Sequence, residues 1–279
     1  MVNIVIVSHS RRLAEGVVEL AVQMTRGRIK MAIAAGIDEP DNDKKNGLGT
    51  DVVAVMSAIE QVYSADGVLV LVDMGSAILS ADMALELLGS EQAKAVYVCA
   101  APLVEGSIAA SVAAAAGMPI EQVIHEAHGA LAAKYRQLNQ TMPLPAEKPS
   151  AASLVAAPLS TDTRKAVIPQ PAEQLQFSWQ IQNPHGIHLR SAAAIVTAVS
   201  PFDADVWLSK GGQQINAKSI NKITLLGLKH HDTVICITRG KEAGPALNAF
   251  RALAQRHFGE DLSGEDILRE GMSGKNTVR

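Results

Sequence analysis

The sequence predicts two domains: an N-terminal α/β domain with a mostly parallel, doubly wound sheet flanked by helices, and a smaller C-terminal α+β open-faced sandwich. Three observations lead to this fold class. Residues 1–138 alternate strand-like and helical patterns, residues 139–174 are rich in proline, and residues 175–260 resume as a second series of short elements. A chain of 279 residues is long enough to build two cores. Residues 261–279 form a polar tail that we expect to be unanchored.

The elements of the first domain follow from the spacing of apolar residues. Short apolar or β-branched runs predict strands at 3–7, 29–34, 68–72 and 96–99. Apolar residues at helical spacing predict helices over about 13–24, 52–62 and 78–88, followed by helical segments up to Leu138. The run VLVLV at 68–72 is apolar at every position, which is typical of a central strand covered on both faces. This alternation favours a parallel sheet with helices on both sides.

The stretch 139–174 separates the two domains. It holds six of the chain's 12 prolines and no glycine. Proline-rich segments without glycine are extended and semi-rigid. We therefore expect either a tether that lets one domain reach several partner sites or a spacer with no further role.

The second domain is predicted as strand, helix, two strands, helix, strand and helix. The strands are FSWQI (177–181), DVWL (205–208), QQIN (213–216) and TVICIT (233–238). One helix follows the turn NPHGIHLR and runs through Val199, a short one is capped by Ser219, and a last one spans 243–258. Gly211-Gly212 fits the turn of a hairpin. This order predicts an α+β layer with its helices gathered on one face.

Composition excludes several classes of function. A net charge of -3 and 3% aromatic residues give neither a basic field nor stacking surfaces for nucleic acid. No run reaches the ~20 apolar residues needed to cross a bilayer, and the N-terminus is a poor secretory signal. The cysteines, Cys99 and Cys236, are too few and too far apart for a disulfide framework or a metal pair. We expect a cytoplasmic protein with no metal and no cofactor.

His188 is the first candidate for chemistry. In NPHGIHLR, residues 183–186 build a turn, and His188 lies where the next helix begins. Helix N-termini offer unpaired N–H groups and a positive dipole, which suit an attached phosphoryl group. A neutral imidazole is a competent nucleophile, and Arg190 can pair with phosphate oxygens. The alternative is a solvated histidine at a helix start, and His185, deeper in the turn, is the local competitor.

The segment NPHGIHLRSAAAIV (183–196) resembles the active-site segment of HPr, the phosphocarrier protein of the sugar phosphotransferase system. NAKSINKITLLGLKHHDTVICI (216–237) resembles the second HPr signature, so the likeness covers the whole C-terminal domain and implies an HPr-like open-faced sandwich. It implies that His188 is phosphorylated and that Arg190 is its phosphate partner. Ser191 replaces the usual proline, from which we expect altered rates but not lost function. Ser219 stands at a serine that is regulatory in some relatives; we favour helix capping.

His9 is the second candidate, because it follows the first strand at its carboxyl end. Ligands of parallel sheets bind at that edge, and Asp73 ends the third predicted strand. If the two strands are neighbours, the Asp73 carboxylate can hold one ring nitrogen of His9 and leave the other as nucleophile. The alternatives are a histidine packed at a strand end and an aspartate capping a helix.

IVIVSHSRRLAEGV (4–17) and DGVLVLVDMGSAILSAD (66–82) resemble the enzyme IIA domain of the mannose-type phosphotransferase group, over about the first 138 residues. The resemblance implies that His9 is the phosphate acceptor and Asp73 its carboxylate partner. We expect Ser10, Gly75 and Ser76 to line the phosphate, with Thr50 and backbone donors of the loop GLGT (47–50) as weaker candidates. It also implies a homodimer formed through this domain.

A mannose-type IIA domain fused to HPr resembles the phosphoryl-transfer subunit of bacterial dihydroxyacetone kinase. This implies enzyme I and HPr as phosphate donors and a nucleotide-binding, ADP-containing kinase subunit as acceptor. Longer relatives continue into an enzyme I-like domain, so we expect separate donors or a longer parent chain.

Two alternatives stay open. One is the IIA component of a mannose-type sugar transporter, and the other is a binding protein regulated by its phosphorylation state. A nucleotide-dependent enzyme is disfavoured, because no GxxxxGK[ST] or GxGxxG follows a predicted strand.

Overall fold

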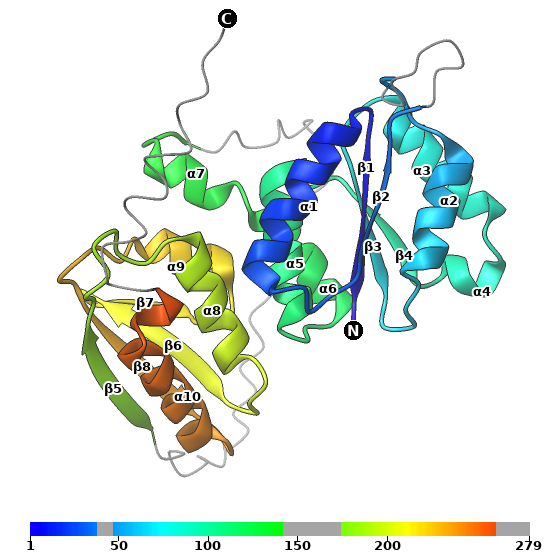
Figure 1. Ribbon diagram of the computed structural model, residues 1–279. Helices are drawn as coiled ribbons and strands as arrows, with labels where there is room; N and C mark the ends of the chain where they lie inside the picture. Colours follow the sequence, from blue (N-terminus) through cyan, green and yellow to red (C-terminus); the bar gives the residue numbers. More distant parts are fainter. Residues whose placement is uncertain (38–46, 142–173, 261–279) are drawn as a thin grey trace, which may run out of the picture.

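The computed structural model describes residues 1–37, 47–141 and 174–260, which form two domains (Figure 1). The elements of the first are β1 (Asn3–Ser8), α1 (Arg11–Thr25), β2 (Met31–Ala35), α2 (Val52–Gln61), β3 (Val68–Val72), α3 (Ser76–Leu87), α4 (Ser90–Ala93), β4 (Val96–Cys99), α5 (Leu103–Ala115), α6 (Ile120–Gly129) and α7 (Ala132–Gln137). Its four strands are parallel in the order β2-β1-β3-β4. The predicted doubly wound sheet is confirmed.

Strands β1 and β3 are fully buried because helices cover both faces of this sheet. One face packs against α1, α5 and α6, and the other against α2 and α3. Val7 is in register with Val72, so the carboxyl ends of β1 and β3 lie side by side. This juxtaposition places the residues that follow them, His9 and Asp73, at one edge of the sheet.

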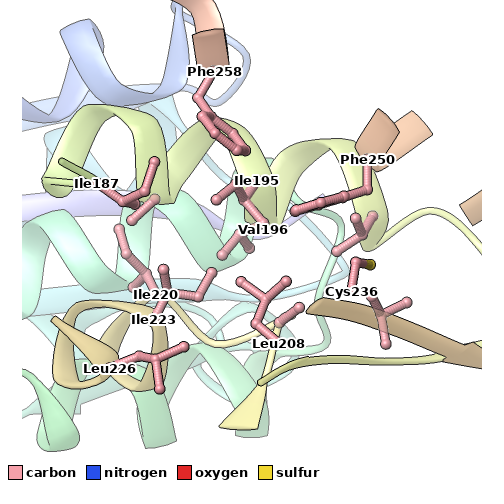
Figure 2. Close-up of a cluster of buried hydrophobic side chains, with 14 of the residues drawn as sticks. Ile187, Ile195, Val196, Leu208, Ile220, Ile223, Leu226, Cys236, Phe250 and Phe258 are labelled. Atoms are coloured by element: carbon pink, nitrogen blue, oxygen red, sulfur yellow. The ribbon is translucent and has the colours of Figure 1, made fainter. Parts of the chain in front are cut away.

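The elements of the second domain are β5 (Leu175–Gln180), α8 (Leu189–Val199), β6 (Asp205–Lys210), β7 (Gln213–Asn216), α9 (Ile220–Leu226), β8 (Thr233–Arg239), α10 (Ala243–Gln255) and the 3-10 turn η1 (His257–Gly259). The strands are antiparallel in the order β5-β8-β6-β7. This is the α+β sandwich predicted. Figure 2 shows its core, in which Leu208 and Cys236 from the sheet meet Ile195 and Val196 from α8.

The last helix is shorter than the sequence predicted. It ends at Gln255 rather than at Phe258, because His257 and Phe258 adopt left-handed backbone angles, with φ of 51° and 56°. Each such residue costs roughly 1–2 kcal/mol. The turn directs the Phe258 ring into the core beside α8, where it is 1% exposed (Figure 2). Burial of a phenylalanine contributes about 1.5–3 kcal/mol, which offsets most of this cost.

The two domains share one continuous hydrophobic cluster. Ala109 and Val112 of α5 and Ala130, just after α6, are buried together with residues of α8 and α9. Helices α7 and α9 also pack against each other (Figure 1).

Candidate functional site

His9 lies at the carboxyl end of β1, in the short connection to α1. Its ring is held from both sides. Nδ1 is 3.0 Å from Oδ1 of Asp73, and Nε2 is 2.9 Å from the hydroxyl of Ser76. The imidazole side chain is 29% exposed, so it remains accessible from solvent while its orientation is fixed.

Asp73 is the centre of this hydrogen-bond network. Its carboxylate accepts from the backbone N–H of His9 at 2.8 Å, the N–H of Met74 at 2.6 Å and the hydroxyl of Ser8 at 2.9 Å. Partial burial acts to raise the pKa of Asp73, but these hydrogen bonds together with that of the His9 side chain outweigh burial and lower the pKa below its ordinary value. Asp73 is therefore an anion at neutral pH.

The charge of Asp73 determines the tautomer of His9. A carboxylate can only accept, so Nδ1 carries the proton and Nε2 presents its lone pair. The Ser76 hydroxyl then donates to Nε2. Ser76 is the first residue of α3, so the N-terminal end of that helix lies on the Nε2 side of the ring; the N–H groups of Ala77 and Ile78 donate to the carbonyls of Met74 and Gly75. Nε2 is thus the ring nitrogen without a proton and is available as a nucleophile, next to a positively polarised helix end.

The other residues expected to line the phosphate lie around this point in different ways. Gly75 has φ 52° and open space at its Cβ position, so it exposes backbone beside Ser76. Thr50 lies 3.1 Å from the Ser76 hydroxyl and reaches His9 through it. Ser10 caps α1, and its hydroxyl accepts from the N–H of Leu13.

Two features near His9 differ from the sequence analysis. In the loop GLGT, the N–H of Gly49 donates to the carbonyl of His9 at 3.0 Å, so it supports the histidine backbone and is not a free donor for phosphate. Ser8 was not singled out, although its buried hydroxyl holds Asp73. As the last residue of an otherwise apolar strand, Ser8 was a detectable polar exception.

The rim of the His9 site is apolar and exposed. Leu48, Met74, Ile78 and Leu79 are 73%, 67%, 43% and 64% exposed. Large apolar side chains gathered on a surface mark contact sites for other proteins. The site therefore suits a macromolecular partner better than a small polar molecule.

His188 is the N-cap residue of α8. The turn before it requires glycine: Gly186 has φ +73°, and a Cβ there would lie 2.2 Å from the carbonyl oxygen of Leu228. Side-chain atoms of N-cap residues reach the free N–H groups of the first turn. A group attached to Nδ1 of His188 would therefore face the positive end of α8.

Ser191 completes this helix start. The N–H of His188 donates to the Ser191 hydroxyl at 3.0 Å, and that hydroxyl lies 3.1 Å from the His188 carbonyl oxygen, to which it donates. Ser191 is fully buried. At the position where the resemblance to HPr leads one to expect proline, this chain thus fixes the backbone of His188 by hydrogen bonds, in the manner of a capping box.

Nε2 of His188 faces an acid that the sequence analysis did not find. Oε1 of Glu260 lies 3.1 Å away; it is buried and makes no hydrogen bond within the described residues, so the contact is electrostatic. Its other oxygen accepts from Nδ2 of Asn183 at 2.7 Å. Glu260 follows the turn made by Phe258 and Gly259. Its role depends on that turn, which helical periodicity did not predict.

Arg190 and His185 lie on either side of His188. Arg190 is exposed and lines a cavity of about 430 Å³ with Arg26 and Arg28 of the first domain. His185 is an exposed turn residue that lines a second cavity, of about 410 Å³, together with His188. Ser219 caps α9, with the N–H of Lys222 at 3.3 Å from its hydroxyl, as expected.

Within residues 1–37, 47–141 and 174–260, no three His, Cys, Asp or Glu side chains are grouped so as to hold a metal ion. Over the same residues, no helix is both long and apolar enough to span a membrane. Cys99 and Cys236 are free and buried.

Comparisons with known proteins agree with both halves of the chain. The family described as PTS system fructose IIA component matches residues 3–124, and the family described as PTS HPr component phosphorylation site matches residues 175–256. His9 with Asp73 lies within the first match, and His188 within the second.

Some relatives match nearly the whole of this chain, and others match only one of its two domains. The phosphoryl donor subunit DhaM of the PEP-dependent dihydroxyacetone kinase of Klebsiella michiganensis is 48% identical over 93% of this chain and 51% of its own length. The corresponding subunit of kinase 2 of Listeria innocua is 32% identical over 45% of this chain and 96% of its own. Phosphocarrier protein HPr of Chlamydia pneumoniae is 35% identical over 32% of this chain and 82% of its own length. The chain thus spans about half the length of the first of these relatives.

Proposed function

Because the chain belongs to the family of phosphoryl donor subunits of PEP-dependent dihydroxyacetone kinase, we propose that it is a two-histidine phosphoryl relay. Enzyme I and HPr supply the phosphate, His188 and His9 carry it, and the nucleotide-binding, ADP-containing subunit of dihydroxyacetone kinase accepts it from His9. The observation that carries this proposal is the ring of His9, held by Asp73 at Nδ1 with Nε2 facing the Ser76 hydroxyl at the start of α3.

The transfer to His9 is a displacement at phosphorus. The lone pair of Nε2 attacks the phosphoryl group of a donor phosphohistidine, the new N–P bond forms, and the donor N–P bond breaks with its electron pair returning to the donor ring. The ring of His9 becomes positively charged, and Asp73 stabilises it through Nδ1–H. The positive end of the α3 dipole balances the phosphoryl charge. No proton has to leave Nδ1, so the phosphate can be passed on by the reverse step.

The same reasoning assigns the opposite nitrogen of His188. Glu260 favours the proton on Nε2, so Nδ1 is the nucleophile at the start of α8. Arg190, in the first turn of the same helix, supplies a positive charge for the phosphate oxygens.

A protein acceptor and a homodimer are both consistent with the surface. The exposed apolar rim of His9 fits a docking acceptor. On α3, Leu79, Met83 and Leu87 are exposed at intervals of four residues and form an apolar stripe. We assign this stripe to the dimer contact of the first domain; light scattering of wild type against Met83→Glu tests it, with a monomer expected from the variant.

The test of the relay is a reconstituted reaction. Phosphoenolpyruvate, enzyme I and HPr should label His9 and His188 with acid-labile phosphate, which alkaline phosphopeptide mapping locates. His9→Ala should abolish phosphorylation of dihydroxyacetone, whereas His185→Ala, which removes an exposed turn histidine near His188, should leave it unchanged. Full kinase activity with His9→Ala would refute the proposal. Offering a IIB protein of a sugar transporter beside the kinase subunit identifies the true acceptor.

A further inference from the structure

Helix α5 is buried on both sides. Ten of its 13 residues, Gly106 to Ala115, are buried. A helix that covers one face of a sheet normally has a polar outer side. Here Ala110, Ala113 and Ala114 pack into the first domain, while Ala109 and Val112 pack into the core of the second. The outer face of α5 is therefore apolar and buried, as in a helix that packs against a second core.

This face is covered by the part of the second domain that surrounds His188; we call the second domain the carrier domain. Helices α8 and α9 lie against α5, and Nδ2 of Asn221 in α9 donates to the backbone carbonyl of Glu126 at 2.8 Å. Alanines at the contact let the helices approach closely. His188 opens into a cavity walled by Ala109, Ala130 and residues of α9. The ring itself remains reachable, but the surface around it is occupied.

In this arrangement His188 is remote from His9. The residues around His9 come from β1, the end of β3 and α3, and none of them lines the cavity of His188. Arg190 instead shares a cavity with Met24 and Arg26 at the C-terminal end of α1. His9 precedes the other end of that helix, which at 15 residues is about 22 Å long (Figure 1). Transfer requires reacting atoms roughly 3–3.5 Å apart.

We propose that the face formed by Ala109, Val112, Glu126, Gly129 and Ala130, the docking surface, is the resting site of the chain's own carrier domain. Resting on the proposed function, this means that a docked carrier cannot give its phosphate to His9. The domain must leave the docking surface, to reach His9 of the same chain or of another. The carrier domain of the same chain is favoured on the docking surface over that of another chain, because the covalent connection holds it at an effective concentration of order millimolar.

A disulfide can test this by locking the docked arrangement. A Cβ placed on Gly129 would lie 3.9 Å from Cγ of Asn221, the position that a cysteine sulfur would take. The double variant Gly129→Cys with Asn221→Cys therefore suits a cross-link. The native thiols should not interfere, because burial raises the pKa of Cys236 to about 12 and also raises the pKa of Cys99.

The reaction is run with phosphoenolpyruvate and enzyme I, first without free HPr. In the oxidised double variant, phosphate on His9 should form at least tenfold more slowly than in the same protein reduced with dithiothreitol. Free HPr should restore labelling of His9 in the oxidised protein, since that site stays open. In each single-cysteine variant, His9 should be labelled at the same rate in the oxidised and the reduced protein.

Three results would overturn the docking proposal: no cross-link forms under oxidation, the cross-link joins separate chains, or His9 is labelled at the same rate in oxidised and reduced protein. Failure of the proposed function has a different signature. In that event neither His9 nor His188 is labelled even in the reduced protein.

Discussion

Replacing Asp73 with asparagine separates the chemical role of this carboxylate from its structural one. Asparagine keeps the shape of the side chain but has no charge and only one acceptor oxygen. Four contacts converge on the carboxylate in the native site, from the backbone of His9 and Met74 and from the side chains of Ser8 and His9. The variant can satisfy only some of them, and it no longer requires the proton of His9 to lie on Nδ1.

The expected loss in rate follows from one of these contacts. A hydrogen bond to a charged group contributes roughly 1.5–3 kcal/mol, and the bond to Nδ1 of His9 strengthens as the ring becomes positive during transfer. Removing it should slow phosphorylation of His9 about 10- to 150-fold. Loss of the backbone contacts should also lower the free energy of unfolding, by about 1–3 kcal/mol.

Rapid-quench kinetics with phosphorylated HPr measures the rate, and urea denaturation measures the stability. Asp51→Asn is the matched control: Asp51 caps α2 in the same domain and accepts from the N–H of Ala54 at 2.7 Å. It should reduce stability by ~1 kcal/mol or less and leave the rate unchanged. If Asp73→Asn slows transfer no more than Asp51→Asn does, the assignment of Asp73 as the partner of His9 is wrong.

Three further predictions concern the other groups. Glu260→Gln should slow phosphorylation of His188 roughly fivefold, because about 1 kcal/mol of charge stabilisation is lost; an unchanged quench-flow rate would contradict this. Ser191→Ala should lower the free energy of unfolding by ~1–2 kcal/mol, and an unaltered thermal midpoint would show that the capping hydrogen bonds contribute nothing. The lowered pKa of Asp73 contributes stability that is complete above its unfolded value of about 3.9 and is lost as pH falls through the folded pKa. The difference in urea midpoint between wild type and Asp73→Asn should therefore stay constant from pH 7 to about 5 and shrink below about pH 3.9.

Most of the fold could be predicted because its elements obey local rules. The run VLVLV at 68–72 is a strand over those same residues, and the order of elements in the second domain is as expected. The proximity of His9 and Asp73 could also be anticipated, since parallel neighbouring strands bring their carboxyl ends together. His9 and Asp73 each come directly after one of these neighbouring strands, which is enough to bring them together.

The missed features depend on contacts between distant parts of the chain. Glu260 reaches His188 only because Phe258 leaves helical geometry to fill the core, and a helical pattern continues smoothly through that point in the sequence. Likewise, α5 was expected only as one of the helical segments up to Leu138, and its sequence does not indicate how many partners bury it. Periodicity describes a single element; it carries no information about a second domain on the far side.

Because α5 belongs to two cores at once, the domains should not melt independently. Pulling the carrier away exposes Ala109 and Val112 to water, and unfolding the first domain removes the wall that supports α8 and α9. Heating should then give one cooperative calorimetric transition where two separate modules would give two. Evolution is constrained in the same way: a larger side chain on the outer face of α5 would need a compensating change in α8 or α9 of the other domain.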